Sequence, residues 1–412
     1  MPVLTVMFPP HRSVADMRAR RSLKIEHKRI HRNAGFTLIE LMVGIIVSLI
    51  CTLAIMAAFA IFEGQKRTTT AGDDAQQNGS FSLYSLERQI RTAGSGLVQG
   101  HGYGIWGCPI TSLSGGGALP AASPAPFTSW PLNTRAVSVL ISSGGSDANG
   151  NALPDIIGVV SGSASARVFK APVSSTPSSS SVVLTNSFGI VKGDYLIAPL
   201  TSGSCAVALS STAPDTTNTI NFDMANTPAT GLVTATNVFD LGPDPTVSLY
   251  GVDLLPTSPT YKSLVTYDLL QRPVNGVAAA ITPLADGIVM IKALYGIHTG
   301  LVAGEDVNYI DSWVAPTGTW AITAISPTAL STASTQAAFN AMTAIKAIRV
   351  VIVAQSRISQ RSQDYATGPT TLTLFTDLPT AQEVTITTDP TYRYKVYDTT
   401  IPIRNALITK YF

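Results

Sequence analysis

The sequence predicts an α+β protein in which one long N-terminal helix packs on a large, mostly antiparallel β domain. An apolar run of 27 residues, from Phe36 to Phe62, contains a single charge, Glu40. Small and apolar residues then recur at three- and four-residue steps, which continues the helix to about Ala93. From residue 97 onward, short apolar stretches alternate with clusters of Gly, Pro, Ser and Asn, a pattern typical of strands joined by turns.

The apolar run is long enough to cross a membrane as a helix, at about 1.5 Å per residue. A lone carboxylate inside such a helix costs about 2.5–3.5 kcal/mol on insertion scales, so we expect Glu40 to meet a positive partner. The nearest candidate is the amine that a cut between Gly35 and Phe36 would create, one helical turn away. The alternative is an ordinary signal anchor in which the acid is incidental.

Residues 1–35 form a basic leader with eight Lys or Arg and two acids. This bias keeps the N-terminal end in the cytoplasm and places the rest of the chain outside it. A nucleic-acid-binding arm is the alternative interpretation. Translation can also start at Met7 or Met17. Without the leader, 19 of the 27 basic and 23 of the 25 acidic residues remain, which leaves a net charge of about −4.

The residues from Gly35 to Glu40, Gly-Phe-Thr-Leu-Ile-Glu, resemble the class III signal of type IV pilins and type II secretion pseudopilins. In that family a membrane-embedded prepilin peptidase cleaves after the glycine and methylates the new N-terminal residue. The resemblance implies cleavage between Gly35 and Phe36 and N-methylation of Phe36. It also implies that Glu40 pairs with the N-terminal ammonium of a neighbouring subunit in a filament.

The helix is expected to continue as an amphipathic half, residues 63–94, after the membrane half, residues 36–62. Gly94 and Gly96 supply the stop signal. Glycines and threonines weaken the helix between residues 64 and 72, so local melting is expected there, or else close packing through the small side chains. Residues 95–412 then form the globular β domain, with room for two lobes.

Further blocks narrow the resemblance to the PilW-type minor pilins. They are residues 75–94 with Gly107-Cys108, residues 193–197 with Cys205, residues 284–288 with 294–296, residues 349–353, and residues 397–405. The blocks follow the family order over most of the mature chain, whereas residues 110–135 and 211–262 match no part of that pattern.

The β domain is predicted to contain strands at residues 136–142, 155–161, 181–185, 194–198, 232–236, 264–269, 287–295, 347–354 and 392–403. The segment 347–354 is apolar on both faces except for Arg349, which predicts a central strand. One short helix is expected at residues 336–345. Residues 119–131 and 174–181 are biased in composition and are predicted to be extended surface loops.

Three patterns that suggest ligand sites are weak. Residues 102–107 satisfy GxGxxG but follow a helix and lack a βαβ frame, which favours a glycine turn. Residues 147–155 space oxygen ligands like part of a calcium loop, without the glycine and terminal glutamate of such loops, which favours a turn over calcium. Only His101 and His298 lie outside the leader, and no catalytic motif includes them. We therefore expect no enzyme activity, no cofactor and no metal.

The three cysteines have different predicted roles. Cys51 lies in the apolar helix and is interpreted as a small apolar filler. Cys108 and Cys205 fall in the exported part, where oxidation is expected, so we predict a disulfide that closes a loop of 97 residues. Such a bridge stabilises the fold by up to about 4–5 kcal/mol in the entropy model. Two buried free thiols are the alternative.

The resemblance implies a membrane-stored, non-enzymatic minor pilin that helps to initiate or cap a type IV pilus. Its implied partners are prepilin peptidase, other minor pilins, the major pilin, the inner-membrane assembly platform with its ATPase, and a large tip adhesin. The protein would lie in the inner membrane with its C-terminal domain in the periplasm, and later in the extracellular pilus. The alternatives are a type II secretion minor pseudopilin and an adhesive or DNA-uptake pilin.

DNA capture is suggested by aromatic and basic residues near the C-terminus. They are Tyr392, Arg393, Tyr394, Lys395, Tyr397, Arg404, Lys410 and Tyr411. A twisted edge strand accounts for the same residues, so nucleic acid is not the expected partner.

Overall fold

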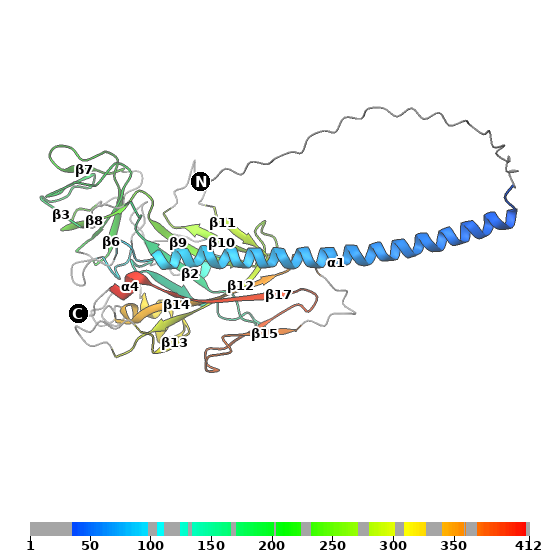
Figure 1. The fold of residues 1–412 in the computed structure, drawn as a ribbon. Helices are drawn as coiled ribbons and strands as arrows, with labels where there is room; N and C mark the ends of the chain where they lie inside the picture. Colours follow the sequence, from blue (N-terminus) through cyan, green and yellow to red (C-terminus); the bar gives the residue numbers. More distant parts are fainter. Residues whose placement is uncertain are drawn as a thin grey trace, which may run out of the picture. The chain divides into compact units, whose positions relative to one another are not determined.

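The computed structural model describes residues 35–97, 105–110, 124–130, 134–165, 170–201, 203–223, 232–270, 280–300, 309–326, 340–357, 359 and 369–408. The chain divides into two units, residues 1–63 and 64–412. Residues 1–34 of the predicted leader lie outside the described part. The ribbon in Figure 1 shows one long helix and several antiparallel sheets, which confirms the predicted α+β class.

The long helix α1 extends from Leu38 to Thr92 as one element, as predicted. It continues through Gly64 and Gly72 without a break. A Cβ at either glycine would meet nothing within 4 Å, and the structure therefore gives no packing reason for these two. The helix is followed by two glycines with positive φ, Gly94 at 81° and Gly96 at 75°. Glycine adopts this non-helical backbone conformation readily, which explains why the helix ends here.

The second half of α1 buries one face in the core of the globular unit. The buried positions are Ala71, Ala75, Gly79, Ser82, Leu86 and Ile90. Their spacing of three or four residues places them on one side of the helix. The small residues come first and the large ones last, and the backbone approaches the sheet closely at Gly79.

The closest approach is between Gly79 and Tyr397, on strand β17 (Tyr394–Pro402). A Cβ at Gly79 would lie only 2.1 Å from the Tyr397 ring. The phenol of Tyr397 donates a hydrogen bond to the Gln76 carbonyl at 3.0 Å. At the helix end, Asn405 in helix α4 (Arg404–Ile408) donates to the Ala93 carbonyl at 2.8 Å. Strand β17 therefore lies along the helix, as Figure 1 shows.

Strand β17 is the edge of a four-stranded antiparallel sheet with the order β13-β12-β14-β17. The other strands are β13 (Ser312–Val314), β12 (Ile288–Ile297) and β14 (Ile345–Gln355). The interior position of β14 confirms the predicted central strand. Arg349 was the one predicted exception to the apolar pattern of this strand. Its guanidinium donates hydrogen bonds to two carboxylates, Asp398 in β17 and Asp377 after β15 (Thr371–Leu374). These hydrogen bonds raise the pKa of Arg349.

A second antiparallel sheet has five strands in the order β1-β2-β9-β10-β11. The strands are β1 (Val139–Ser142), β2 (Ile156–Ser161), β9 (Thr246–Asp253), β10 (Ser263–Asp268) and β11 (Thr282–Asp286). The side chain of Tyr295 in β12 reaches this sheet and accepts a hydrogen bond from the Ile141 backbone N–H at 2.5 Å. Burial raises the pKa of Tyr295.

A buried ion pair also joins the two sheets. Lys292 Nζ in β12 lies 2.8 Å from Asp155 Oδ1, just before β2. The Asp155 carboxylate accepts two backbone N–H bonds at 3.0 Å, from Gly144 and Ala293. Burial raises the pKa of Asp155, and Lys292 and these donors oppose that shift. Breaking such a buried pair from one side leaves a charge without its partner, which is costly.

Between β2 and β9, which are neighbours in the five-stranded sheet, the chain builds a further layer. It comprises a sheet of β3 (Ala171–Pro172), β8 (Asn237–Gly242), β5 (Tyr195–Pro199) and β6 (Cys205–Leu209), and a ribbon of β4 (Ser181–Val183) and β7 (Thr219–Asn221). One face of this sheet, including Ile197 and Phe239, belongs to the main core. The other face, including Leu196 and Val238, packs in a second core under the ribbon.

Most predicted strands are present with boundaries shifted by a few residues, but two expectations were wrong and a third was confirmed only in part. The strand predicted at residues 232–236 is absent: residues 232–234 form a turn, and β8 begins only at Asn237. Leu232 and Ala235 are buried in the second core. The predicted helix 336–345 is helical at residues 340–344, whereas Ile345 begins β14; residues 336–339 lie outside the described part. Phe127, in the predicted surface loop 119–131, is fully buried in a short 3-10 helix (Phe127–Ser129).

Several short elements were not predicted. They include β6, β7, β9, β13, β15, the strand β16 (Val384–Thr387), the 3-10 helix Gly318–Trp320 and helix α2 (Ile322–Ile325). Many of them are rich in Thr, Ser or Ala, so their local pattern resembles a loop. Their pairing partners, which lie elsewhere in the chain, decide that they become strands.

The contact between Gly79 and Tyr397 predicts opposite effects for two glycine substitutions in α1. Gly79→Ala inserts a methyl group into the Tyr397 ring and should lower the free energy of unfolding by about 1–3 kcal/mol. The matched control, Gly72→Ala, enters open space and should raise it by about 0.5–1 kcal/mol, because alanine favours the helix. Denaturant unfolding of the full chain in detergent measures both. Equal effects of the two substitutions would contradict the proposed close approach.

Candidate functional site

The start of helix α1 is defined by a side-chain cap. Thr37 Oγ1 accepts a hydrogen bond from the Glu40 backbone N–H at 3.2 Å, and the Thr37 carbonyl accepts from the Leu41 N–H at 3.1 Å. Threonine at the cap with glutamate three residues later is the capping-box pattern. Gly35 and Phe36 therefore remain outside the helix, and both are exposed. Sequence reasoning missed the role of Thr37, although its spacing to Glu40 carried the signal.

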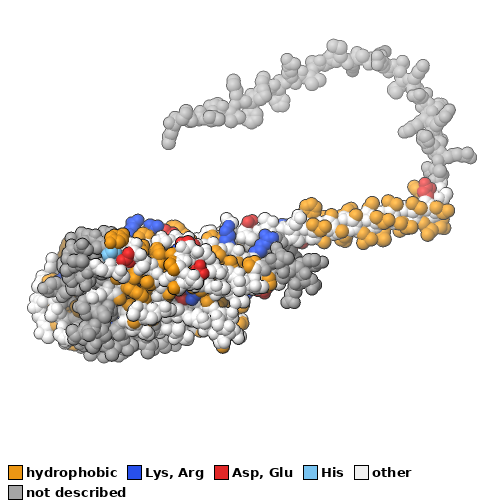
Figure 2. Space-filling model, turned by 90° about the horizontal axis from the view of Figure 1, so that it is seen from below, with side chains coloured by type: hydrophobic (Ala, Val, Ile, Leu, Met, Phe, Trp, Pro, Cys, Tyr) orange, Lys and Arg blue, Asp and Glu red, His pale blue; other side chains and the backbone are white. Residues whose placement is uncertain are grey.

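The first half of α1 presents apolar side chains on all sides. Figure 2 shows this segment covered by hydrophobic atoms, with one acidic group at its start. The side chains of Leu38 and Leu53, for example, are 77% and 62% exposed. Among the described residues, α1 is the one helix that is long and apolar enough to cross a membrane. Cys51 is a free thiol within this segment, and Glu40 is exposed on the first turn.

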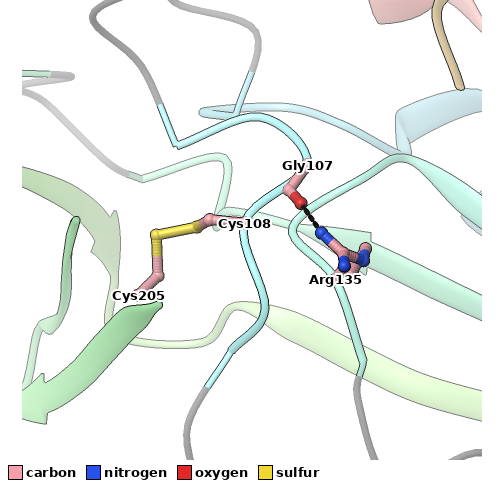
Figure 3. Close-up of a disulfide and its surroundings, with 4 residues drawn as sticks. All are labelled: Gly107, Cys108, Arg135 and Cys205. Carbon is pink, nitrogen blue, oxygen red and sulfur yellow. Dashed lines mark hydrogen bonds between the residues drawn. A yellow bond between two sulfur atoms is a disulfide. The ribbon is translucent and has the colours of Figure 1, made fainter. Parts of the chain in front are cut away.

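A disulfide joins Cys108, after the helix, to Cys205 at the start of β6. Figure 3 shows the two side chains meeting between these segments. The two Cα atoms lie 5.8 Å apart, and the bridge spans 97 residues of sequence. Backbone bonding supports it, because the Cys205 N–H donates to the Pro109 carbonyl at 2.8 Å. The bridge therefore ties the layer inserted between β2 and β9 to the segment that follows α1.

A buried arginine holds the other side of the same segment. Arg135 Nη1 donates to the Gly107 carbonyl at 2.6 Å, and Nε donates to Ser326 Oγ at 3.1 Å (Figure 3 shows the first contact). Arg135 is only 1% exposed, and burial lowers its pKa. Sequence reasoning did not identify this residue, because a lone arginine between loops carries no pattern.

Two family models match the chain. The model described as the prokaryotic N-terminal methylation motif matches residues 30–56, and the model described as type IV pilus-assembly protein W matches residues 257–405. No curated protein and no solved structure matches the chain significantly. The chain therefore carries the N-terminal methylation motif and a C-terminal region that matches the PilW family of type IV pilus-assembly proteins. That family is generally non-enzymatic.

The two matches cover different parts of the chain. The methylation motif includes the capped helix start and most of the apolar run. The PilW match contains strands β10 to β17, and with them the four-stranded sheet that contacts α1. The layer inserted between β2 and β9 and the disulfide lie outside both matches.

The remaining predicted ligand patterns have structural explanations where they are described. Asp147 Oδ1 accepts from the Asn149 and Asn151 N–H groups at 2.8 Å, and Oδ2 accepts from the Asn151 side chain at 2.9 Å. These bonds lower the pKa of Asp147 and form the turn that was favoured over calcium. Within the described ranges, no three His, Cys, Asp or Glu side chains form a metal-sized cluster. Residues 101–104, with His101, lie outside those ranges.

The aromatic and basic residues of the DNA hypothesis make contacts within the chain. Tyr394 accepts hydrogen bonds from Gln355 and from the Asp389 N–H, Lys395 and Tyr397 contact Gln76, and Tyr392 lies under the Lys262 ammonium. These contacts support the edge-strand interpretation of the segment. Lys410 and Tyr411 lie outside the described part.

The disulfide predicts a defined loss of stability when both thiols are removed. Cys108→Ser with Cys205→Ser should lower the free energy of unfolding by about 2–4 kcal/mol, since the unfolded chain regains the freedom of the closed loop. Non-reducing peptide mapping of the wild-type chain should give a Cys108–Cys205 linked peptide. Cys51→Ala is the matched control and should change neither result. Complete alkylation of Cys108 and Cys205 without reductant would refute the bridge.

Proposed function

We propose that this chain is a minor pilin that helps to initiate or cap type IV pilus assembly. The observation that carries the proposal is the capped start of α1, where a non-helical Gly35-Phe36 pair precedes an apolar helix with one acid on its first turn. A chain of this kind is stored in a membrane and passes into a filament without unfolding. The PilW match supports a function in a type IV pilus rather than in a type II secretion pseudopilus.

The proposed first step is processing at the cytoplasmic face. Prepilin peptidase would cut between Gly35 and Phe36, remove the basic leader and methylate the Phe36 amine. The Thr37 cap supports this step, because it keeps the cut bond outside the helix, where a peptidase can take it in extended form. The apolar helix then remains in the inner membrane, with the β domain in the periplasm.

The second step is assembly. In a filament, the apolar halves of neighbouring helices leave the membrane and pack together, so no water remains to solvate Glu40 or the new ammonium. Pairing the two charges between neighbours removes both penalties. The partners would be other minor pilins, the major pilin, the assembly platform and a large tip adhesin.

Processing is tested by Gly35→Val. A branched side chain at the cut should leave the leader attached and the protein in the membrane, because the peptidase requires a residue without a side chain there. The mass of the membrane-extracted protein reports the result. Gly64→Ala, at an exposed helix position outside the motif, serves as the control and should be cleaved normally. A free Phe36 N-terminus in the Gly35→Val protein would rule out the proposed site.

Assembly is tested by Glu40→Val and Glu40→Gln in a strain that lacks the wild-type chain. Both variants should be cleaved and inserted normally, yet be absent from sheared pili, because the neighbour's ammonium would be buried without its counter-charge. A strain that carries either Glu40 variant in place of the wild-type chain should make several-fold fewer pili than the same strain complemented with the wild-type gene.

The control for assembly is Ser48→Ala, which removes a polar group from the same apolar helix and should change nothing. Normal incorporation of either Glu40 variant would exclude the pairing role. A normal number of pili in the strain without the chain would exclude the initiation or capping function itself.

A further inference from the structure

The face of α1 opposite the buried one is exposed among the described residues and carries an ordered charge pattern. Toward the C-terminus it presents the exposed pair Asp73 and Asp74, then Phe81 and Tyr84, which are 51% and 64% exposed, and then Arg88. At 100° per residue these side chains share one side of the helix. Acidic, aromatic and basic groups therefore follow one another along a single exposed face.

The basic end of this face is hollowed. A groove of about 320 Å³ lies between α1 and α4 and is lined by Tyr84, Glu87, Arg88, Arg91, Thr92 and Arg404. Arg91 Nε donates to Glu87 at 2.8 Å. Arg88 and Arg404 make no ion pair with any described residue. The groove thus holds three arginines against one glutamate.

The chemistry of the groove selects a carboxylate. Each guanidinium presents donors in a fork that matches the two oxygens of a carboxylate. An exposed apolar contact at Phe81 and Tyr84 lies beside it, which suits a protein surface. The groove residue Arg88 lies 26 positions beyond the end of the apolar run at Phe62, which disfavours a lipid headgroup as the source of the anion.

We propose that this groove receives the Asp73–Asp74 pair of a second copy of the chain. The inference rests on the proposed function, since two copies held in one membrane or filament have parallel helices. Asp74 and Arg88 are 14 residues apart, so the copies would be displaced by about 21 Å along the helix. Asp73 and Asp74 are exposed and have no described cationic partner, so each chain carries both halves of the contact.

The contact is tested by crosslinking two differently tagged full-length copies in the cell membrane, in a Cys51→Ala background. Thr70→Cys in one copy and Tyr84→Cys in the other have the same 14-residue offset and leave the charges intact. A short bismaleimide should crosslink this pair. Gln77→Cys with Tyr84→Cys, half the offset on the same face, should crosslink about tenfold less, which corresponds to about 1.4 kcal/mol.

Charge reversal then tests the chemistry. Arg88→Glu with Arg404→Glu in the Tyr84→Cys copy should lower the yield about tenfold, and Asp73→Arg with Asp74→Arg in the other copy should restore it. Lys192→Glu with Arg357→Glu reverses two exposed charges elsewhere and should have no effect. Equal crosslinking at Gln77, no loss on reversal, no restoration, or crosslinks only to a different protein would each overturn the proposal.

The result is independent of the test of the proposed function. Pilus number in the strain without the chain decides whether the protein acts in pilus assembly. The offset dependence and the charge restoration decide whether two copies meet through this groove. Normal piliation together with the expected crosslinks would reject the proposed function alone, and reduced piliation without those crosslinks would reject this contact alone.

Discussion

One helix has to satisfy two environments, and the rest of the structure follows from that constraint. The first half of α1 is apolar on every side, and burying each large aliphatic side chain is worth about 1.5–3 kcal/mol, which is consistent with a membrane-anchored or pilus-associated segment. The second half buries only one face. Its small residues, such as Ala75 and Gly79, let the sheet approach closely. The Tyr397 ring lies directly against the helix backbone at Gly79, where a Cβ atom would not fit.

The globular unit is arranged to hold that helix face in place. Strand β17 contacts the helix, and Arg349 links this strand to the turn after β15. The Asp155–Lys292 pair joins the two large sheets. The disulfide and Arg135 together position the segment that leaves α1. All of these links are polar or covalent and join segments far apart in the sequence. They define the geometry of a domain whose helix, among the described residues, is exposed on its other face.

The candidate site needs very little chemistry, and that is why it can be identified from a short motif. A glycine, a capping threonine and one acid lie within six residues, and the roles that we propose for them depend on backbone geometry or charge rather than on a three-dimensional constellation. Thr37 begins the helix after Phe36, and Glu40 is then placed on the first turn by the helix itself. No distant residue is required to build this arrangement, so the local sequence contains nearly all of it.

The sequence by itself determined the long helix, its apolar and amphipathic halves, its stop at Gly94 and Gly96, and the central strand β14, because these depend on composition and periodicity within one segment. Only the tertiary structure decided the role of Gly79, the partners of Arg349 and Asp155, the turn at residues 232–234, and the burial of Phe127. Each of these depends on a neighbour contributed by a remote part of the chain. Pairing and close packing between distant segments leave no periodic signal in the sequence, so these contacts can be identified only in the folded structure.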